Sequence, residues 1–518
     1  MRKIYKILFS RYFISAVVIL AEFFLIFYLY ATAYGFSRYA FAVVGSVNFF
    51  VVISLVNRNS NPEFKLSWLV IVTLASPFGA LLYAVFYSRR LSRREARFMR
   101  EVQDALEGAP SDVGGAECDI EFLELKGLDR LAAGKAFSIL SDDRLANLYK
   151  NSSSRFFGRG EDMFCSMIRD ISAAEKYVFL EYFIIAKGVM WEKIFGLLRQ
   201  KAAEGVEIRV IYDDIGCMRT LPSGFADTLA EAGIRCASFS PVTPKISSSH
   251  NNRDHRKILV IDGRVAYTGG INIADEYINA KERFGHWKDG GVRVSGEAAE
   301  GFLRLFLSSW NFTLGALGDI EKYLPTPSAK REEGDGGFYI PFGTGPFPIY
   351  SRPGGKNLLL NIINQAKSYV YMTTPYLVID YDLTEAIRNA ARRGVDVRII
   401  TPGIADKRTV KVMTKSAYPY LIDAGVRIYE YRPGFIHEKC VVSDDLYALV
   451  GTINLDYRSL AHHYEDGVWI YRSPTVISAR DEFLNTVSRS DEVGRREAHL
   501  TPIEWTVRNF IRIFAPLL

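Results

Sequence analysis

The amino-acid sequence predicts an α/β protein made of two similar halves, with transmembrane helices in front of them. Three observations predict this fold. Apolar segments fill most of the first ninety residues, strand-like and helix-like segments alternate after them, and their order repeats after about 180–190 residues. The chain has 518 residues, which is enough for roughly three domains of about 150 residues each.

Three apolar segments form the N-terminal region. They cover residues 12–34, 39–56 and 68–87, and Glu22 is the one charged residue in them. About 20 apolar residues span a hydrocarbon core of roughly 30 Å, whereas the apolar core of a cleaved signal peptide has about 7–15 residues. Buried helices of a soluble protein are the alternative. Three such segments in one block favour a membrane protein, with residues 1–100 as its membrane region.

The number of membrane crossings, two or three, stays open. Clusters of basic residues stand on both sides of the apolar block, and such clusters favour the cytoplasm. They are Arg2, Lys3, Lys6 and Arg11 before the first segment, and Arg89, Arg90, Arg93, Arg94, Arg97 and Arg100 after the third. Two crossings place both clusters inside, whereas three place one of them outside. The second cluster favours a cytoplasmic position for the rest of the chain.

The remaining chain contains the repeat. Residues 177–183 and 208–212 are typical of buried strands, and 191–203 has helical spacing. The letters "AEKYVFLEYF" from Ala174 are similar to "AKSYVYMTTPYL" from Ala366. A period this long indicates a duplicated domain and not a solenoid.

The repeat and the composition predict where the chain divides. The predicted parts are a linker and lead-in (101–150), a first half (151–322), a hinge (323–337), a second half (338–490) and an amphipathic C-terminal segment (491–518). The last segment has apolar residues at helical spacing with arginines between them. This pattern suits a helix on a membrane surface, and it suits a helix packed on the protein equally well.

A polar motif occurs once in each half. Both copies read H-x-K, four residues, D, six residues, G-x-x-N. They are His255, Lys257, Asp262 and Asn272 in the first half, and His437, Lys439, Asp444 and Asn454 in the second. On a strand, residues two apart share a face, so each histidine points the same way as its lysine. A lone H-x-K is usually surface polarity, but two copies with identical spacing among only seven histidines indicate function.

The residue types in the motif suit phosphate chemistry. A lysine neutralises an oxyanion while a histidine attacks phosphorus or transfers a proton. The two asparagines can donate further hydrogen bonds to phosphoryl oxygens. Each aspartate follows its lysine by five residues, so a structural ion pair and direct catalysis both stay open for Asp262 and Asp444.

The paired motifs resemble those of the phospholipase D superfamily, in which two such halves form one active site at their interface. Segments from Asn57, Thr373, Arg427 and Gly451 are similar to bacterial cardiolipin synthases, and the likeness runs from about Tyr39 to the C-terminus. The resemblance implies two tandem phospholipase D-like α/β/α sandwich halves in an enzyme of the bacterial cell membrane.

The resemblance also implies the reaction, a transfer of a phosphatidyl group without metal or other cofactor. One histidine attacks phosphatidylglycerol and releases glycerol, and a second phosphatidylglycerol then displaces the enzyme to give cardiolipin. By analogy His255 is the nucleophile and His437 the acid and base, with the reverse assignment open. Phosphatidylethanolamine as a second substrate and the oligomeric state also stay open.

Superfamily members carry an orienting carboxylate about thirty residues beyond each motif histidine. Asp289 and Glu465 occupy those places here, although surface acids are the alternative interpretation. His286, His462 and His463 lack motif partners and are expected to be peripheral.

Composition bears on the competing functions, a hydrolytic phospholipase D and a membrane-anchored nuclease of the same superfamily. A net charge of only +6 and the membrane block argue against a nucleic-acid partner. Five cysteines without a CxxC spacing predict neither a disulfide framework nor a metal site. The wording around Thr374 and Asn454 favours a synthase over a hydrolase.

Overall fold

A computed structural model describes the chain in segments. They are residues 24, 28, 32, 38–58, 61–74, 79–86, 93–109, 127–140, 144–242, 251–318, 320–324, 334–346, 349–350 and 352–517. The predicted apolar segment 12–34 therefore lies outside the described residues except at three isolated positions, and residues 325–333 of the predicted hinge also lie outside them.

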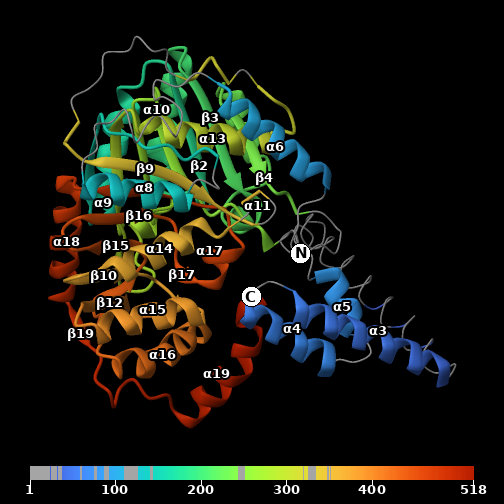
Figure 1. The fold of residues 1–518 in the computed structure, drawn as a ribbon. Helices are drawn as coiled ribbons and strands as arrows, with labels where there is room; N and C mark the ends of the chain where they lie inside the picture. Colours follow the sequence, from blue (N-terminus) through green and yellow to red (C-terminus); the bar gives the residue numbers. More distant parts are fainter. Residues whose placement is uncertain are drawn as a thin grey trace.

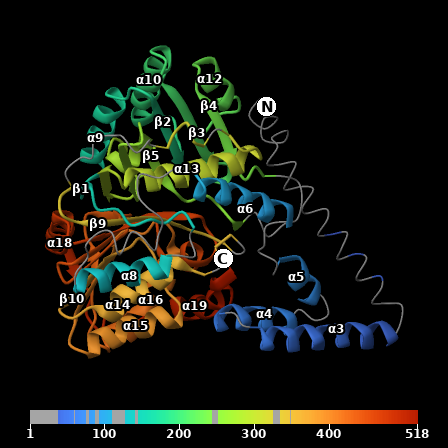
Figure 2. The same ribbon diagram turned by 45° about the horizontal axis from the view of Figure 1, so that its top comes forward.

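Three helices of the N-terminal region pack on one another and stand to one side of the rest of the molecule (Figures 1 and 2). They are α3 (Arg38–Asn57), α4 (Pro62–Leu74) and α5 (Gly79–Phe86). The predicted segment 39–56 lies within α3. Of the predicted segment 68–87, residues 68–74 lie in α4 and 79–86 in α5. Within the described part of the chain, no helix combines the length and the apolar character needed to cross a membrane. The predicted transmembrane helices therefore stay a prediction.

Two helices at the predicted linker belong to the folded body, and the first of them begins at Arg93, within the predicted membrane region. Helix α6 (Arg93–Glu107) packs on α13 of the first half, and α8 (Leu128–Leu140) packs on α14 of the second. On α6, Met99, Val102 and Leu106 are buried in an apolar core that contains residues of both halves. The lead-in thus covers both halves instead of only connecting them.

The first half is built on a seven-stranded mixed sheet with the order β1-β8-β6-β5-β2-β3-β4. Its strands are β1 (Ser152–Phe157), β2 (Tyr177–Tyr182), β3 (Glu207–Asp213), β4 (Arg235–Phe239), β5 (Lys257–Ile261), β6 (Val265–Gly269) and β8 (Gly291–Gly296). Its helices are α9 (Gly160–Ser172), α10 (Val189–Ala203), α11 (Asp214–Cys217), α12 (Phe225–Glu231), the 3-10 helix η2 (Asp275–Ile278) and α13 (Ala299–Leu314). The predicted strands and helix of this half are confirmed as β2, β3 and α10.

The second half repeats this order, with one more strand at its edge: β9-β18-β16-β15-β10-β12-β13-β19. Its strands are β9 (Phe338–Thr344), β10 (Tyr369–Thr373), β12 (Asp396–Pro402), β13 (Arg427–Tyr431), β15 (Cys440–Ser443), β16 (Tyr447–Gly451), β18 (Glu465–Tyr471) and β19 (Ser490–Glu492). Its helices are α14 (Gly354–Gln365), α15 (Tyr381–Arg392), α16 (Arg408–Ile422), α17 (Tyr457–Ala461) and α18 (Pro474–Val487). The duplication is therefore present in the strand order, while the predicted limits 151–322 and 338–490 stay a prediction.

The two halves share one apolar core. Along β2, Tyr177 and Phe179 face the core that contains α13 and α18, whereas Val178 and Leu180 face α9 and α10. This alternation is the period of two that a strand buried on both faces produces. The shared core also holds Tyr339 of β9. The halves are thus joined over their inner faces, with helices on the outer faces (Figure 1).

The C-terminal segment forms helix α19 (Pro502–Phe514), followed by the 3-10 helix η3 (Ala515–Leu517). Thr501 and Glu504 cap α19 reciprocally, which satisfies amide groups at its start. The helix packs on α16 and α4, and its Ile503 and Phe510 stay exposed. The structure is therefore compatible with both interpretations of the amphipathic pattern. One side of the helix packs on the protein, and another side is free to lie on a membrane surface.

The motif aspartates lie in the turns after β5 and β15, away from the histidines. Asp262 accepts hydrogen bonds from the backbone N–H groups of residues 175, 176 and 177. Asp444 accepts from those of residues 367, 368 and 369. Both aspartates have φ near +55°, a conformation that Asp tolerates better than most residues. Each carboxylate thus joins a turn to the start of the neighbouring strand, and a catalytic role for either aspartate stays a prediction.

We expect Asp444→Ala to lower the free energy of unfolding by about 2 kcal/mol, because three backbone donors lose their acceptor. Asp444→Asn, which keeps one acceptor oxygen, should cost less. Urea unfolding followed by circular dichroism measures both. Unchanged stability in the alanine variant would contradict this structural role.

Candidate active site

His255 lies in a buried segment just before β5. The Arg253 guanidinium forms a two-pronged ion pair with Asp213 at 2.9 Å, and the Asp254 N–H donates to the same carboxylate. A planar guanidinium suits such a carboxylate contact. These bonds fix the backbone on which His255 is held, and its side chain is only 9% exposed.

Each motif histidine contacts a carboxylate of the other half. His255 Nδ1 lies 2.8 Å from Glu465 Oε2, and His437 Nδ1 lies 2.7 Å from Asp289 Oδ2. Both carboxylates are fully buried. The two predicted orienting residues are therefore at the histidines, but sequence spacing pairs each with the histidine of its own half. The structure exchanges these partners.

Backbone pairing between the halves produces this exchange. Strand β7 (His286–Lys288) pairs in parallel with β14 (Gly434–Ile436), so that Asp289 and His437 follow the paired strands side by side. At the other histidine, the His255 N–H donates to the Tyr464 carbonyl at 2.8 Å, next to Glu465. Each histidine is thus held in register with the carboxylate that it contacts.

The two motif lysines are buried beside their histidines. Lys257 Nζ donates to the His255 carbonyl at 2.6 Å, and Lys439 Nζ lies 2.9 Å from His437 Nδ1. Burial lowers the pKa of Lys257 to about 8 and that of Lys439 to about 7, although nearby carboxylates oppose the change. The site therefore gathers two amines, two carboxylates and two imidazoles, and an anionic substrate would favour the cationic form of the amines.

Burial also sets the charge of the histidines. It lowers the pKa of His255 well below its usual range, and burial together with the Lys439 charge lowers the pKa of His437 to about 4. Burial alone would raise the pKa values of Asp289 and Glu465, but the histidine that each contacts holds both below their usual range. Two carboxylates therefore face two neutral imidazoles.

These charges define the imidazole tautomers. An ionised carboxylate only accepts hydrogen bonds, so Nδ1 of each histidine carries the proton that it donates. The lone pair then lies on Nε2, which is the atom left for chemistry on a substrate.

Aromatic side chains surround the histidines, and the motif pattern did not reveal them. The His255 ring lies 5.0 Å from Phe183, and the His437 ring lies 5.5 Å from Tyr277 and 5.6 Å from Trp287. Among the described residues the buried Trp287 indole N–H has no hydrogen-bond partner. It is thus a donor that a substrate oxygen could use.

The two motif asparagines differ in what they contact. Asn272 accepts from the Ile184 N–H and donates to the Tyr277 hydroxyl at 2.7 Å, so its amide is already used within the protein. Asn454 keeps its side-chain oxygen without a partner in the described structure. The Asn272 N–H group is thus already used within the protein. The free Asn454 oxygen is an acceptor, so the phosphate contact expected of both asparagines stays a prediction.

The other histidines of this region occupy different surroundings. His286 is partly buried and contacts the Tyr431 hydroxyl, and His462 Nε2 lies 3.2 Å from the Pro516 carbonyl. The expectation that His463 is peripheral is wrong, because its ring lies 5.4 Å from that of His255. The sequence held one signal for this position: His463 precedes the predicted orienting residue Glu465 by two residues. His255, His463 and Glu465 together could hold a metal ion, with their ligand atoms within 4.8 Å of one another.

Two family models match the sequence. The model described as "Cardiolipin synthase, PLD-like domain" matches residues 167–283 and 359–487, one stretch in each half. The model described as "Phospholipase_D-nuclease N-terminal" matches residues 46–86. Both motif lysines and their histidines lie in the two stretches of the first match, and α3 to α5 lie largely in the second.

Similar proteins come from several bacteria. A cardiolipin synthase of Halalkalibacterium halodurans is 30% identical over 491 residues, covering 92% of this chain and 94% of the relative. An uncharacterised protein of Streptococcus mutans is 44% identical over 372 residues, covering 72% and 80%. A phosphatidylserine synthase of Haemophilus influenzae has a similar fold, with a TM-score of 0.56, 15% identity, and coverage of 74% of this chain and 98% of that one. The chain belongs to the bacterial cardiolipin synthases of the phospholipase D superfamily.

Proposed function

We propose that this chain is a cardiolipin synthase that transfers a phosphatidyl group from one phosphatidylglycerol to another. Its products are cardiolipin and glycerol. The observation that supports this best is the pair of buried imidazoles, each with a lysine beside it and a carboxylate behind it. Similarity to cardiolipin synthases over nine-tenths of the chain supports the substrate class.

The first step forms a covalent intermediate. Nδ1 of His255 donates a hydrogen bond to Glu465 and keeps its proton, and the Nε2 lone pair attacks phosphorus. The bond from phosphorus to the glycerol oxygen breaks, and that oxygen takes a proton from Nε2 of His437. The phosphatidyl group is then bound to His255.

The second step uses a lipid as the acceptor. His437 takes the proton of the terminal hydroxyl of a second phosphatidylglycerol, whose oxygen attacks phosphorus. The bond from phosphorus to His255 breaks and cardiolipin leaves. Because the halves are nearly equivalent, the reverse assignment of the two histidines is the alternative.

Charge stabilises the transition states of both steps. Lys257 and Lys439 neutralise the phosphoryl oxygens, and the anionic phosphodiester in turn favours the cationic form of His437 that the first step needs. Asn454 supplies a further polar contact, whereas Asp289 and Glu465 act through the histidines. Asp262 and Asp444 act on the fold.

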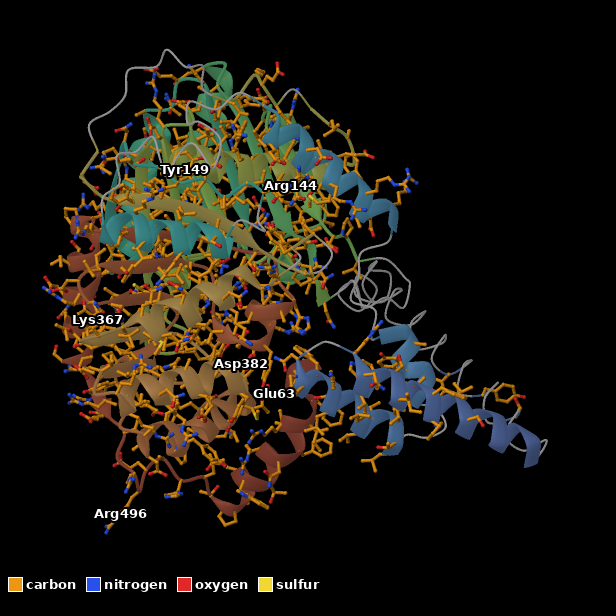
Figure 3. The ribbon with its side chains drawn as sticks, viewed as in Figure 1. Glu63, Arg144, Tyr149, Lys367, Asp382 and Arg496 are labelled. Atoms are coloured by element: carbon orange, nitrogen blue, oxygen red, sulfur yellow. The ribbon has the colours of Figure 1, made fainter. Side chains whose placement is uncertain are left out.

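The substrate supports a position at the bacterial cell membrane, with residues 1–100 as the membrane region and the catalytic halves on the cytoplasmic side. Phospholipid is the partner, and nucleic acid is not. The contacts that join the N-terminal helices to the catalytic halves support this arrangement: Glu63 accepts from the Tyr381 N–H at 3.1 Å and contacts the Tyr457 hydroxyl. Figure 3 shows Glu63 where those helices meet the second half.

We expect one glycerol to be released per cardiolipin formed, with little phosphatidic acid. Water is present at roughly 55 M, so a transferase must hold its lipid acceptor in position to compete with it. Purified protein in phosphatidylglycerol vesicles, with radiolabelled lipid and a glycerol assay, measures all three products. Phosphatidic acid as the main product would instead assign a hydrolytic phospholipase D.

Replacement of either motif histidine should stop the reaction. We expect His255→Gln and His437→Gln each to lower turnover by about a thousandfold or more, because neither histidine can do the work of the other. His286→Gln, outside the proposed mechanism, is the matched control. Quenching the wild type in denaturant at alkaline pH, where a phosphorus–nitrogen bond survives, should leave label on His255. Label on His437 would reverse the roles, and wild-type turnover in His437→Gln would refute the mechanism.

The depressed pKa of His437 predicts a stability that depends on pH. The folded value is about 4 and the unfolded value about 6.5, so the unfolded state binds more protons between them. Stability is therefore full above pH 6.5 and falls as the pH drops. Between pH 7 and 5 this histidine should remove about 2 kcal/mol. Urea unfolding at both pH values should show a smaller loss in His437→Gln, and an equal loss would contradict the shift.

A further inference from the structure

His463 is a buried group that the proposed reaction does not use. It follows α17, and its side chain is only 9% exposed. In the described structure neither ring nitrogen has a hydrogen-bond partner, and Nδ1 lies 3.6 Å from Glu465 Oε1, beyond hydrogen-bond length. A buried polar group without a partner costs about 1–3 kcal/mol. The carboxylate of Glu465 lies close to Nδ1, and both ring nitrogens keep capacity for a further ligand.

The neighbours of His463 supply further ligand atoms. Glu465 stands between the two imidazoles, with Oε2 2.8 Å from His255 Nδ1 and Oε1 on the side of His463. Ser459 donates to Oε1 at 2.5 Å, a bond that orients the carboxylate as outer contacts do in metal sites. Two imidazoles and a carboxylate are therefore held together by residues of both halves.

The spacing of these atoms suits a small divalent ion. Zinc binds histidine nitrogen and carboxylate oxygen at about 2.0–2.2 Å in a tetrahedron, whose ligand atoms are about 3.3–3.5 Å apart. The distances of 2.8 Å and 3.6 Å lie on either side of that range, and all three ligand atoms lie within 4.8 Å of one another. Two histidines, one carboxylate and an open fourth position form a known zinc-binding set.

We propose that His255, His463 and Glu465 form an inhibitory site for Zn²⁺ or a similar transition-metal ion. A metal bound there removes Glu465 from its role behind His255 and uses a nitrogen of the nucleophile. Catalysis by the proposed mechanism requires no metal, so the ion lowers activity. The inhibition rests on the proposed function, whereas the binding itself rests on the geometry alone.

Binding is measured first, on the full-length protein in detergent without lipid. Calorimetry with Zn²⁺, and visible absorption with Co²⁺ as a probe of tetrahedral coordination, should give one ion per chain. Loss of a ligand costs more than loss of an outer contact, which typically weakens binding by about 10–100-fold. His463→Gln should therefore weaken binding by at least about 100-fold, whereas His463→Cys, which offers a thiolate, should keep it.

His499→Gln is the matched control, because His499 is an exposed histidine away from the site; it should bind like the wild type. Unfolding midpoints establish that each variant is folded. Absence of binding in the wild type, or equal binding in His463→Gln, would overturn the proposal.

Activity is measured second. Zn²⁺ should slow the wild type by about tenfold or more, with recovery in EDTA, while His463→Gln relative to its own zinc-free rate should be insensitive. Equal zinc inhibition of wild type and His463→Gln would place the inhibitory ion elsewhere and refute the proposal. If the protein formed no cardiolipin, the proposed function would fail, but the binding result would still decide whether the metal site exists.

Discussion

The site depends on the contacts between each motif histidine and a buried carboxylate of the other half. Each histidine has its carboxylate on the other half, so neither half contains a complete catalytic pair. Orientation of an imidazole by a buried carboxylate sets which nitrogen carries the proton. The shared apolar core and the small inter-half sheet of β7 and β14 are therefore part of the chemistry, because they hold a histidine of one half at the acid of the other.

The two halves are nearly equivalent, but they differ in the residues that surround the two motif histidines. Asp289 is one methylene shorter than Glu465, and Gly270 makes room for it: a Cβ at Gly270 would lie 2.0 Å from Asp289 Oδ1. At the matching position of the second half, the Thr452 side chain instead bonds with the Asp466 backbone. His463 adds an imidazole beside His255 and has no counterpart at His437, which is enclosed by Tyr277 and Trp287. Different surroundings are what two histidines with different tasks require.

The sequence predicted the parts of this site that depend on local pattern. The two H-x-K pairs, the strands around them and the duplicated order follow from the spacing of residues along the chain, which can be seen without the fold. The exchange of Asp289 and Glu465 could not be predicted, because spacing along the chain contains no information about pairing between distant strands. His463 was missed for the same reason: only the bridge between Asp254 and Tyr464 brings it to His255. Asp262 belongs to the motif by spacing, yet its partners are backbone amides that no side-chain pattern reveals.

The N-terminal helices reach the site through α17. Phe64 of α4 packs on the rings of Tyr457 and His462, which flank the short helix that carries Ser459. Ser459 in turn donates to Glu465, the carboxylate behind His255. The proposed membrane region therefore contacts the element that supports the nucleophile. A synthase that joins two lipid substrates into a lipid product needs its site at the membrane surface. This series of contacts links the proposed anchor to the reacting imidazole through Tyr457, Ser459 and Glu465.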